Sequence, residues 1–238
     1  MIHTPSLIPA TNDRAKKETE DAKEEEEDMA TDFTLILSGQ VESAKVYYFS
    51  LSIHLFLSFA RFITESHTQR VYQFHSIDNA YCKYSFSYGP DWRPIQGVEQ
   101  GISQISRKAG GSNQLIVWNF PIDIAFQSTN AHGWPRLVVS VYNLDFMGRD
   151  VVRGYACVLV PPFPGRYVRY AKMFVPCSTS MMQGFLAWLS GNRPEFYHAK
   201  FISQGKDREV TKVSSSGVVK VVLNVTAMGL KKCGYSSS

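Results

Sequence analysis

Short runs of apolar residues, separated by polar turn-forming segments, dominate the chain and predict β-strands. The densest region is residues 114–155, where three apolar runs are rich in Val, Ile, Phe, Tyr and Trp. These residue types fit a pleated, half-buried surface, and consecutive short strands between turns are typical of a sandwich or barrel. The three runs are Leu115–Phe120, Ile122–Phe126 and Leu137–Tyr142.

Five further strands are predicted outside this region. The clearest alternation is in Tyr81–Tyr88, where Cys82, Tyr84 and Phe86 share one face and are expected to be buried. The total predicts an all-β fold, a single β-sandwich of about eight strands. The remaining four strands are Phe33–Val41, Val151–Val160, Tyr167–Val175 and Val218–Ala227.

Three segments lack the strand pattern. Val98–Lys108 is polar and mixed, which favours a loop or a short helix, and Met181–Leu189 favours a helical or irregular segment. Gly191–Thr211 is polar and is predicted to be a long connection.

Charge divides the chain into an acidic leader and a basic remainder. Residues 1–32 contain 4 Lys/Arg and 10 Asp/Glu, whereas the rest contains 21 Lys/Arg and 11 Asp/Glu. The leader has almost nothing to bury, so we expect a disordered, solvated segment, although an acidic interaction tail is an alternative. A basic folded part suits an acidic protein partner, a lipid headgroup or RNA, and charge does not choose among them.

One apolar segment does not fit the strand pattern. Val46–Ile63 is rich in aromatic and aliphatic residues but contains His54 and Arg61. A membrane span needs about 20 predominantly apolar residues, so this run is slightly short and is interrupted. We rank an inserted segment first, a peripheral amphipathic segment second and a transmembrane helix third.

The cysteines and the N-terminus indicate a reducing compartment. Cys82, Cys157, Cys177 and Cys233 are widely spaced and have no metal-binding spacing, so we expect free thiols. The N-terminus has no basic segment leading into an apolar stretch, so a signal peptide is not predicted.

A calcium site is the first candidate chemistry, because clustered aspartates in loops at one end of a sandwich can bind this hard cation. The candidates are Asp91, Asp145 and Asp150. They form no dense acidic pattern, and Arg149 adds a positive charge, so we expect no metal site. Instead we expect the last two aspartates to shape a turn and to pair with Arg149 or Arg153.

No catalytic constellation is present, so an enzyme and a cofactor are not predicted. His132 lies in a turn beside Gly133, where a capping or solvated role is the ordinary one, and His75 and His198 have equally plain contexts. Gly97 and Gly101 lack the lysine and the preceding strand of a phosphate-binding loop. No catalytic, cofactor-binding or metal-binding residue is therefore assigned.

A basic strand is the best candidate surface. Within Arg166–Lys172, alternation places Arg166, Val168, Tyr170 and Lys172 on one face. Basic residues near an anionic leaflet contribute about 1 kcal/mol each, so weak and reversible attachment is the most that this strand predicts. A plain solvated strand face is the alternative.

Eight sequence words occur in order and resemble the B9-domain family. The resemblance covers Phe33–Ala44 and Gln73–Tyr235, which is nearly the whole predicted domain, and the two longest words are unusual. The words are GQVESA, YCKY, YGPDW, EQGISQI, VWNFPIDIAFQSTN, GWPRLVVSVY, DVVRGY and FVPCSTS.

The resemblance implies a C2-like antiparallel β-sandwich and a non-enzymatic role. It implies a structural or adaptor component of the tectonic-like, Meckel-type complex at the ciliary transition zone, near the basal body in the cytoplasm and cytoskeleton. The implied partners are other B9-domain paralogues and further transition-zone proteins, with weak contact to an anionic membrane and none with nucleic acid. A calcium-independent phospholipid-binding module is the alternative.

The resemblance also implies the domain organisation. An acidic leader at residues 1–32 precedes a B9 domain at residues 33–235, and residues 236–238 form a tail. Relatives in the family begin near Met29 and pass almost directly from GQVESA to Gln73, so Lys45–Tyr72 is an insertion. One hypothesis is a retained intron, which transcript sequencing across Ala44–Gln73 would refute by finding the insertion in the mature message.

Overall fold

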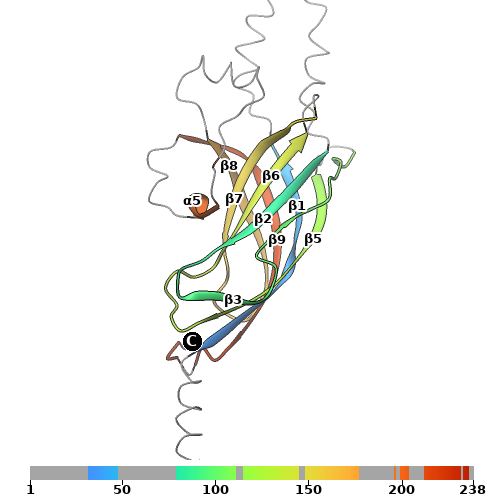
Figure 1. Ribbon diagram of the computed structural model, residues 1–238. Coiled ribbons are helices and arrows are strands. Elements are labelled where there is room, and N and C mark those ends of the chain that lie inside the picture. Colours follow the sequence, from blue (N-terminus) through green and yellow to red (C-terminus); the bar gives the residue numbers. More distant parts are fainter. Residues whose placement is uncertain are drawn as a thin grey trace, which may run out of the picture.

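The structure, a computed structural model, describes residues 32–47, 79–110, 115–144, 148–176, 196, 199–203, 212–231 and 233–235. Within them nearly all secondary structure is antiparallel β, with one short helix (Figure 1). The predicted all-β fold is confirmed, with nine strands rather than about eight. The elements are β1 (Phe33–Val46), β2 (Ala80–Ser87), β3 (Trp92–Gly97), β4 (Gln100–Ile102), β5 (Leu115–Ser128), β6 (Arg136–Leu144), β7 (Asp150–Leu159), β8 (Gly165–Pro176), α5 (Ala199–Ser203) and β9 (Val213–Met228).

The strands follow one order, β3-β5-β1-β9-β8-β7-β6-β2-β4, which folds over at the contact between β7 and β8. Among the described residues these two strands share one register pair, Tyr155 with Phe174, whereas β8 pairs with β9 along its whole length. The order therefore divides into two facing layers, as in a C2-like sandwich. Phe86 of one layer meets Phe126 of the other in the core, with ring centroids 5.5 Å apart.

The other side of the sandwich is closed by residues 92–108, which we name the crossing segment. It begins as β3, paired with β5, and the N–H of Val98 still donates to the carbonyl of Asp123 on β5. The chain then passes to the second layer, where β4 pairs with β2. The crossing segment therefore joins the two layers at the edge opposite β7 and β8.

The prediction of a loop or short helix over Val98–Lys108 is wrong for Gln100–Ile102, which form β4, whereas the other residues of this stretch belong to no named element. This stretch contains β4, and beyond it Ser106 forms an isolated bridge with Ala80 of β2. An edge segment contacts the core with only part of one face, so the alternation that identifies a strand in sequence is absent. The same reason hides β3, which has a proline and a glycine among its six residues.

Strand β5 is continuous where the sequence predicts two runs. It passes through Pro121, so the predicted break between Leu115–Phe120 and Ile122–Phe126 is wrong. Proline cannot donate a ladder hydrogen bond and is tolerated where one side of a strand is open. Because β3 covers β5 only from Ile124 onward, that side of β5 is free of β3 at Pro121.

The main core lies between the layers and follows the predicted alternation. Phe33, Leu35 and Leu37 of β1 are fully buried, and so is Cys82 of β2. On β2 the buried face is the predicted one, because Tyr84 and Phe86 are also buried. Sequence periodicity thus identified the inner face of β2 correctly.

A smaller apolar cluster lies on the outer face of β6 and β7, beneath α5 (Figure 1). It contains Val138, Val152, Tyr155 and Ile202. The hydroxyl of Tyr155 accepts a hydrogen bond from the N–H of Phe196 at 3.2 Å. Since α5 lies within the stretch predicted to be a plain connection, this packing was not foreseen.

Several sequence predictions concern residues outside the described part: most of the leader, most of the Lys45–Tyr72 insertion, Met181–Leu189 and the tail. Their roles stay predictions. Asp32, placed at the end of the leader, is described, and its carboxylate accepts a hydrogen bond from Gln127 at 2.8 Å. Among the residues that the structure describes, no helix is long and apolar enough to cross a membrane.

Candidate interaction surfaces

An aromatic cluster closes one end of the sandwich. Trp92 and Trp134 meet edge to face with centroids 4.9 Å apart, and Phe33 lies 5.3 Å from Trp92. Both indole N–H groups donate to backbone carbonyls, Trp92 to His132 at 2.8 Å and Trp134 to Val160 at 2.9 Å. Buried tryptophans with satisfied donors are architectural. The YGPDW and GWPRL words therefore serve the fold.

Two turns cross beside this cluster at a pair of glycines. The N–H of Gly89 donates to the carbonyl of Gly133 at 2.8 Å. A Cβ added to Gly133 would lie 2.5 Å from the Cα of Gly89, and the backbone of Gly133 has φ 71°. Both positions therefore require glycine for close approach, and Gly133 also requires it for its left-handed conformation.

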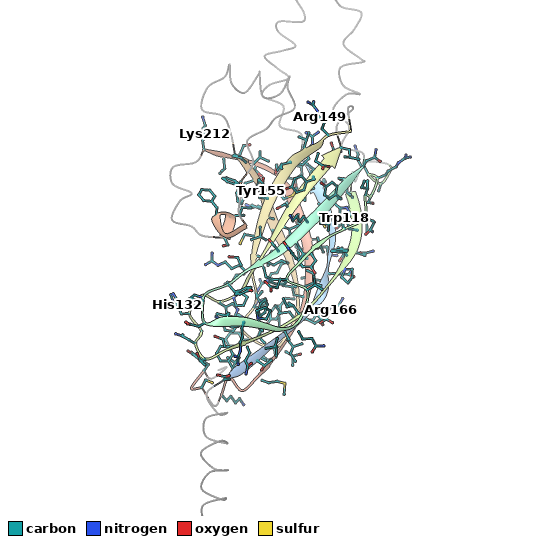
Figure 2. The ribbon with its side chains drawn as sticks, viewed as in Figure 1. Trp118, His132, Arg149, Tyr155, Arg166 and Lys212 are labelled. Carbon is teal, nitrogen blue, oxygen red and sulfur yellow. The ribbon has the colours of Figure 1, made fainter. Side chains whose placement is uncertain are left out.

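In the sequence word VWNFPIDIAFQSTN, the side chain of Trp118 lies in the core. Its side chain is 3% exposed and its N–H donates to the carbonyl of Ala80 at 2.9 Å (Figure 2). The next residue, Asn119, is left-handed with φ 47°, at a shift in the pairing of β5 with β1. Such bulges bend a strand, and asparagine tolerates the left-handed region better than most residues.

Three of four aromatic residues in the densest apolar region, residues 114–155, belong to the main core or pack against it. Trp118 is in the core, and Phe120 and Trp134 pack against it. Tyr142 lies instead on the outer face, where its ring stacks on Tyr81 with centroids 5.3 Å apart. Alternation along β6 places Tyr142 on the outer face of the strand. A continuous apolar run does not show which of its residues face outward.

The described calcium candidates do not converge. Asp91 lies in the turn before β3, at the end of the molecule that carries His132, and Asp150 begins β7 beside Arg149. Figure 2 shows His132 and Arg149 at opposite ends of the molecule. Asp145 is outside the described residues. Within the described part of the chain, no group of three or more His, Cys, Asp or Glu could hold a metal ion.

Arg153 binds a neighbouring amide at a bulge between β6 and β7. Its guanidinium donates to Oδ1 of Asn143 at 2.9 Å, and Asn143 is buried. The expected pairing of the loop aspartates with Arg149 or Arg153 stays a prediction, because Asp145 lies outside the described residues.

Among the described residues, His132 and Cys82 occupy structural positions. The backbone N–H of His132 donates to Oδ1 of Asn130 at 2.9 Å, so this residue has the expected turn role, while His75 and His198 are outside the described part. Burial raises the pKa of the Cys82 thiol to about 11. Cys157 and Cys233 are partly buried cysteines outside any disulfide, and Cys177 is not described.

The basic strand forms an exposed cationic surface on β8. Arg166 and Lys172 are exposed on one face, together with Val168 at 46% and Tyr170 at 68% exposure, as the alternation predicted. Arg169 lies 5.4 Å above the ring of Tyr167. This surface is a candidate for contact with anionic groups.

The adjacent cation on β9 is already paired. The Lys220 ammonium lies 2.7 Å from Oε1 of Glu42 on β1, and this hydrogen bond raises the pKa of Lys220. The available positive charge on this face therefore belongs mainly to β8.

The crossing segment is a surface that the sequence did not predict. Ile95, Val98, Ile102 and Ile105 are each more than half exposed, although they are large aliphatic residues. The sequence did contain one signal of this surface. These aliphatic residues occur in a stretch with neither strand nor helix periodicity, so they do not define one face that a core would bury. Four exposed aliphatics in one short segment are a candidate protein contact.

Comparison with known proteins identifies a family for the chain. The family model described as "B9-C2: Ciliary basal body-associated, B9 protein" matches residues 66–226. A solved C2 domain of plant Extended Synaptotagmin 1 aligns with 82% of this chain and 95% of its own chain. The sequence identity is 10% and the TM-score is 0.35. That structural likeness is too weak to carry a conclusion.

Curated relatives match most of the chain. B9 domain-containing protein 1 of Xenopus laevis is 53% identical over 165 residues, covering 69% of this chain and 83% of the relative. The Mus musculus protein of the same name is 46% identical over 205 residues, covering 86% and 87%. B9 domain-containing protein 2 of Xenopus laevis is 27% identical over 164 residues, covering 69% and 90%. The chain therefore belongs to the B9-C2 family of ciliary basal body-associated proteins.

Proposed function

We propose that this chain is a non-enzymatic adaptor in the tectonic-like, Meckel-type complex at the ciliary transition zone. In that role it contributes to the diffusion barrier between the ciliary and plasma membranes and is required for ciliogenesis. Its partners are other B9-domain proteins and further transition-zone components.

The family match over residues 66–226 is the observation that carries this proposal. The structural roles of the family words support it. Trp92, Trp118 and Trp134 use their polar atoms in the fold, and Gly89 and Gly133 serve a close backbone crossing. Residues that resemble the family are thus devoted to architecture, which suits a protein that acts by assembly.

Affinity purification of the full-length tagged chain from ciliated cells tests the proposal, with imaging of the same tag. We expect recovery of B9-domain and other transition-zone proteins and a signal at the ciliary base. A tagged chain carrying Gly133→Ala, which disturbs the fold, is the control for nonspecific capture. Purification without any transition-zone component would contradict the adaptor role.

A second candidate function is favoured by the exposed face of β8. Arg166, Tyr170 and Lys172 together offer two cations and an aromatic ring to an anionic lipid surface. Each cation near such a surface contributes about 1 kcal/mol before screening, so binding through these residues alone is weak and salt-sensitive.

Vesicle flotation distinguishes this function from the adaptor role. The purified chain is mixed with phosphatidylserine vesicles and with neutral phosphatidylcholine vesicles. A lipid-binding module floats only with the anionic vesicles, and Arg166→Glu with Lys172→Glu abolishes flotation. If the wild-type chain stays unbound at low salt, lipid binding through β8 is excluded.

A further inference from the structure

Beyond Trp92, which is buried, the crossing segment has an inverted distribution of side chains. Its small and polar residues face the sandwich: a Cβ on Gly101 would lie 2.8 Å from Cε1 of Tyr84, and Ser103 is 7% exposed. Its large aliphatics face outward, with Val98 58% and Ile102 60% exposed. Burial of apolar surface contributes about 25 cal/mol per Å². A second surface that covers these side chains would therefore be stabilised in its contact with this segment.

Strand β4 within this segment also has an open backbone edge. It is the last strand in the sheet order, and Tyr84 pairs with Gly101. The N–H of Phe86 donates to the carbonyl of Glu99, so the odd-numbered residues form the ladder bonds with β2. In an antiparallel pair, the residues between these point their backbone N–H and C=O groups away from the partner strand. The N–H and C=O groups of Gln100 and Ile102 therefore lie at the open edge of β4.

Two other exposed strand sides carry features that discourage pairing. Strand β3 contains Pro94 and a bulge at Ile95. The side of β8 that diverges from β7 carries Arg166, Arg169 and Lys172. Prolines, bulges and charges are the usual means by which sheet edges avoid other strands. Strand β4 has none of these, because its residues are Gln100, Gly101 and Ile102.

The surroundings of β4 favour a particular kind of strand. A shallow hollow of about 460 Å³ lies beside it, lined by Phe86 and Val98 together with the polar residues Ser85, Glu99 and Gln100. Two exposed cations flank the edge, Lys83 opposite Ile102 and Arg107 beyond it, while the one adjacent carboxylate of the described residues, Glu99, accepts a hydrogen bond from the hydroxyl of Tyr88. The cations outnumber the carboxylate, so the edge favours acidic residues beside the incoming strand.

We propose that the β4 edge is a strand-addition site for another B9-type sandwich. An extended strand of that partner, with aliphatic residues at alternate positions and acidic flanks, pairs with the backbone of Gln100 and Ile102 and covers Ile102 and Ile105. Backbone pairing supplies affinity and the side chains supply specificity. The inference rests on the proposed function, because it takes the B9-domain partner from it.

The test uses the full-length chain and purified B9 domain-containing protein 2 of the same species. Ile102→Pro removes an edge N–H that does not bond to β2, so it is expected to fold and to weaken binding at least about tenfold. Ile102→Lys places a charge on the edge, as a second variant should the proline disturb folding. The matched control is Val168→Lys on β8, similarly exposed, which should leave the Kd unchanged.

Amide hydrogen exchange locates the contact independently. Exchange at Gln100 and Ile102 should slow in the complex. Binding that is unaffected by both Ile102 variants, or protection on β8 instead, overturns the β4 site and leaves the adaptor role standing. Absence of binding by the wild-type chain overturns this contact too, while recovery of transition-zone proteins from cells still tests the adaptor role. Self-association through β4 without heterologous binding would also contradict the proposal.

Discussion

Two glycines decide how one end of this sandwich closes. The turn before Trp92 and the turn before Trp134 can place both indoles in one cluster only if their backbones nearly touch. Gly89 and Gly133 allow this contact, and their hydrogen bond of 2.8 Å fixes it. The absence of a side chain is therefore as important here as the two tryptophans.

Replacing Gly133 with alanine should destabilise the protein strongly. The left-handed backbone costs about 1–2 kcal/mol for a residue with a Cβ, and the close approach to Gly89 adds to it, for a total above about 3 kcal/mol. Urea unfolding measures this loss. Gly148→Ala is the control, since Gly148 is also left-handed but a Cβ there meets nothing within 4 Å. Equal losses for the two variants would show that the close crossing is not what requires glycine.

The buried thiol of Cys82 predicts a loss of stability at alkaline pH. Burial disfavours the thiolate and raises the pKa of this thiol from its ordinary value of 9.0 to about 11 in the folded protein. Between these values the unfolded chain loses a proton that the folded chain keeps, so the free energy of unfolding falls as pH rises.

From pH 8 to about pH 10.5 this one group should remove about 2 kcal/mol. Denaturant titrations at several pH values measure the trend, and Cys82→Ala removes this contribution while other groups still titrate. If the variant and the wild type lose stability in parallel, Cys82 is not the cause.

At the scale of single elements, bulges and one small helix shape the two layers. Register shifts at Glu42 on β1 and Ser216 on β9 bend the first layer, and one at Arg153 bends the second. Helix α5 then covers part of the outer face of the second layer through Ile202. It has five residues, so its own hydrogen bonds cannot hold it, and packing must do so.

Ile202→Asp should release α5 and leave the sandwich folded. Cys157 packs against the same outer cluster, so its rate of modification by a thiol reagent should rise at least about tenfold. Mass spectrometry can assign the modified residue. Cys82 should stay protected because it lies in the main core, and its modification would show that the whole domain had unfolded instead. Val168→Asp, on the exposed face of β8, is the control.

At the scale of the molecule, the two layers place most candidate chemical groups far apart. Asp91 and Asp150 belong to opposite ends, and the exposed cations of β8 lie on a different element from the aliphatics of the crossing segment. The molecule therefore offers separate surfaces for contact and, in its described part, no convergent acidic site. This arrangement suits a protein that bridges several partners.

Calcium should leave the stability of the whole protein unchanged. Ligand that binds only the folded state raises Tm, and about 5 mM calcium would saturate even weak sites of the C2 type. Thermal unfolding with calcium and with EDTA should therefore agree within about 1 °C. Magnesium at the same concentration controls for ionic strength. A calcium-specific rise in Tm would point to ligands that include the loop containing Asp145.

The sequence alone determined where most of the long strands lie, the inner face of β2 and the family. Alternation in β2 and the apolar runs of β5, β6, β7 and β9 are local properties, since each inner face must be apolar wherever its strand lies. The basic face of β8 followed from the same rule. The sequence words identified the family because they include residues, such as Trp92 and Gly133, whose roles tolerate few substitutes.

Only the tertiary structure decided the short edge strands, the outward position of Tyr142 and the packing of α5. These features depend on contacts between residues distant in sequence, such as Ser106 with Ala80 and Phe196 with Tyr155. The exposed aliphatics of the crossing segment are the clearest case. Whether Ile102 lies in the core or on the surface depends on which face of β4 is turned toward the opposite layer. No local sequence pattern contains that information.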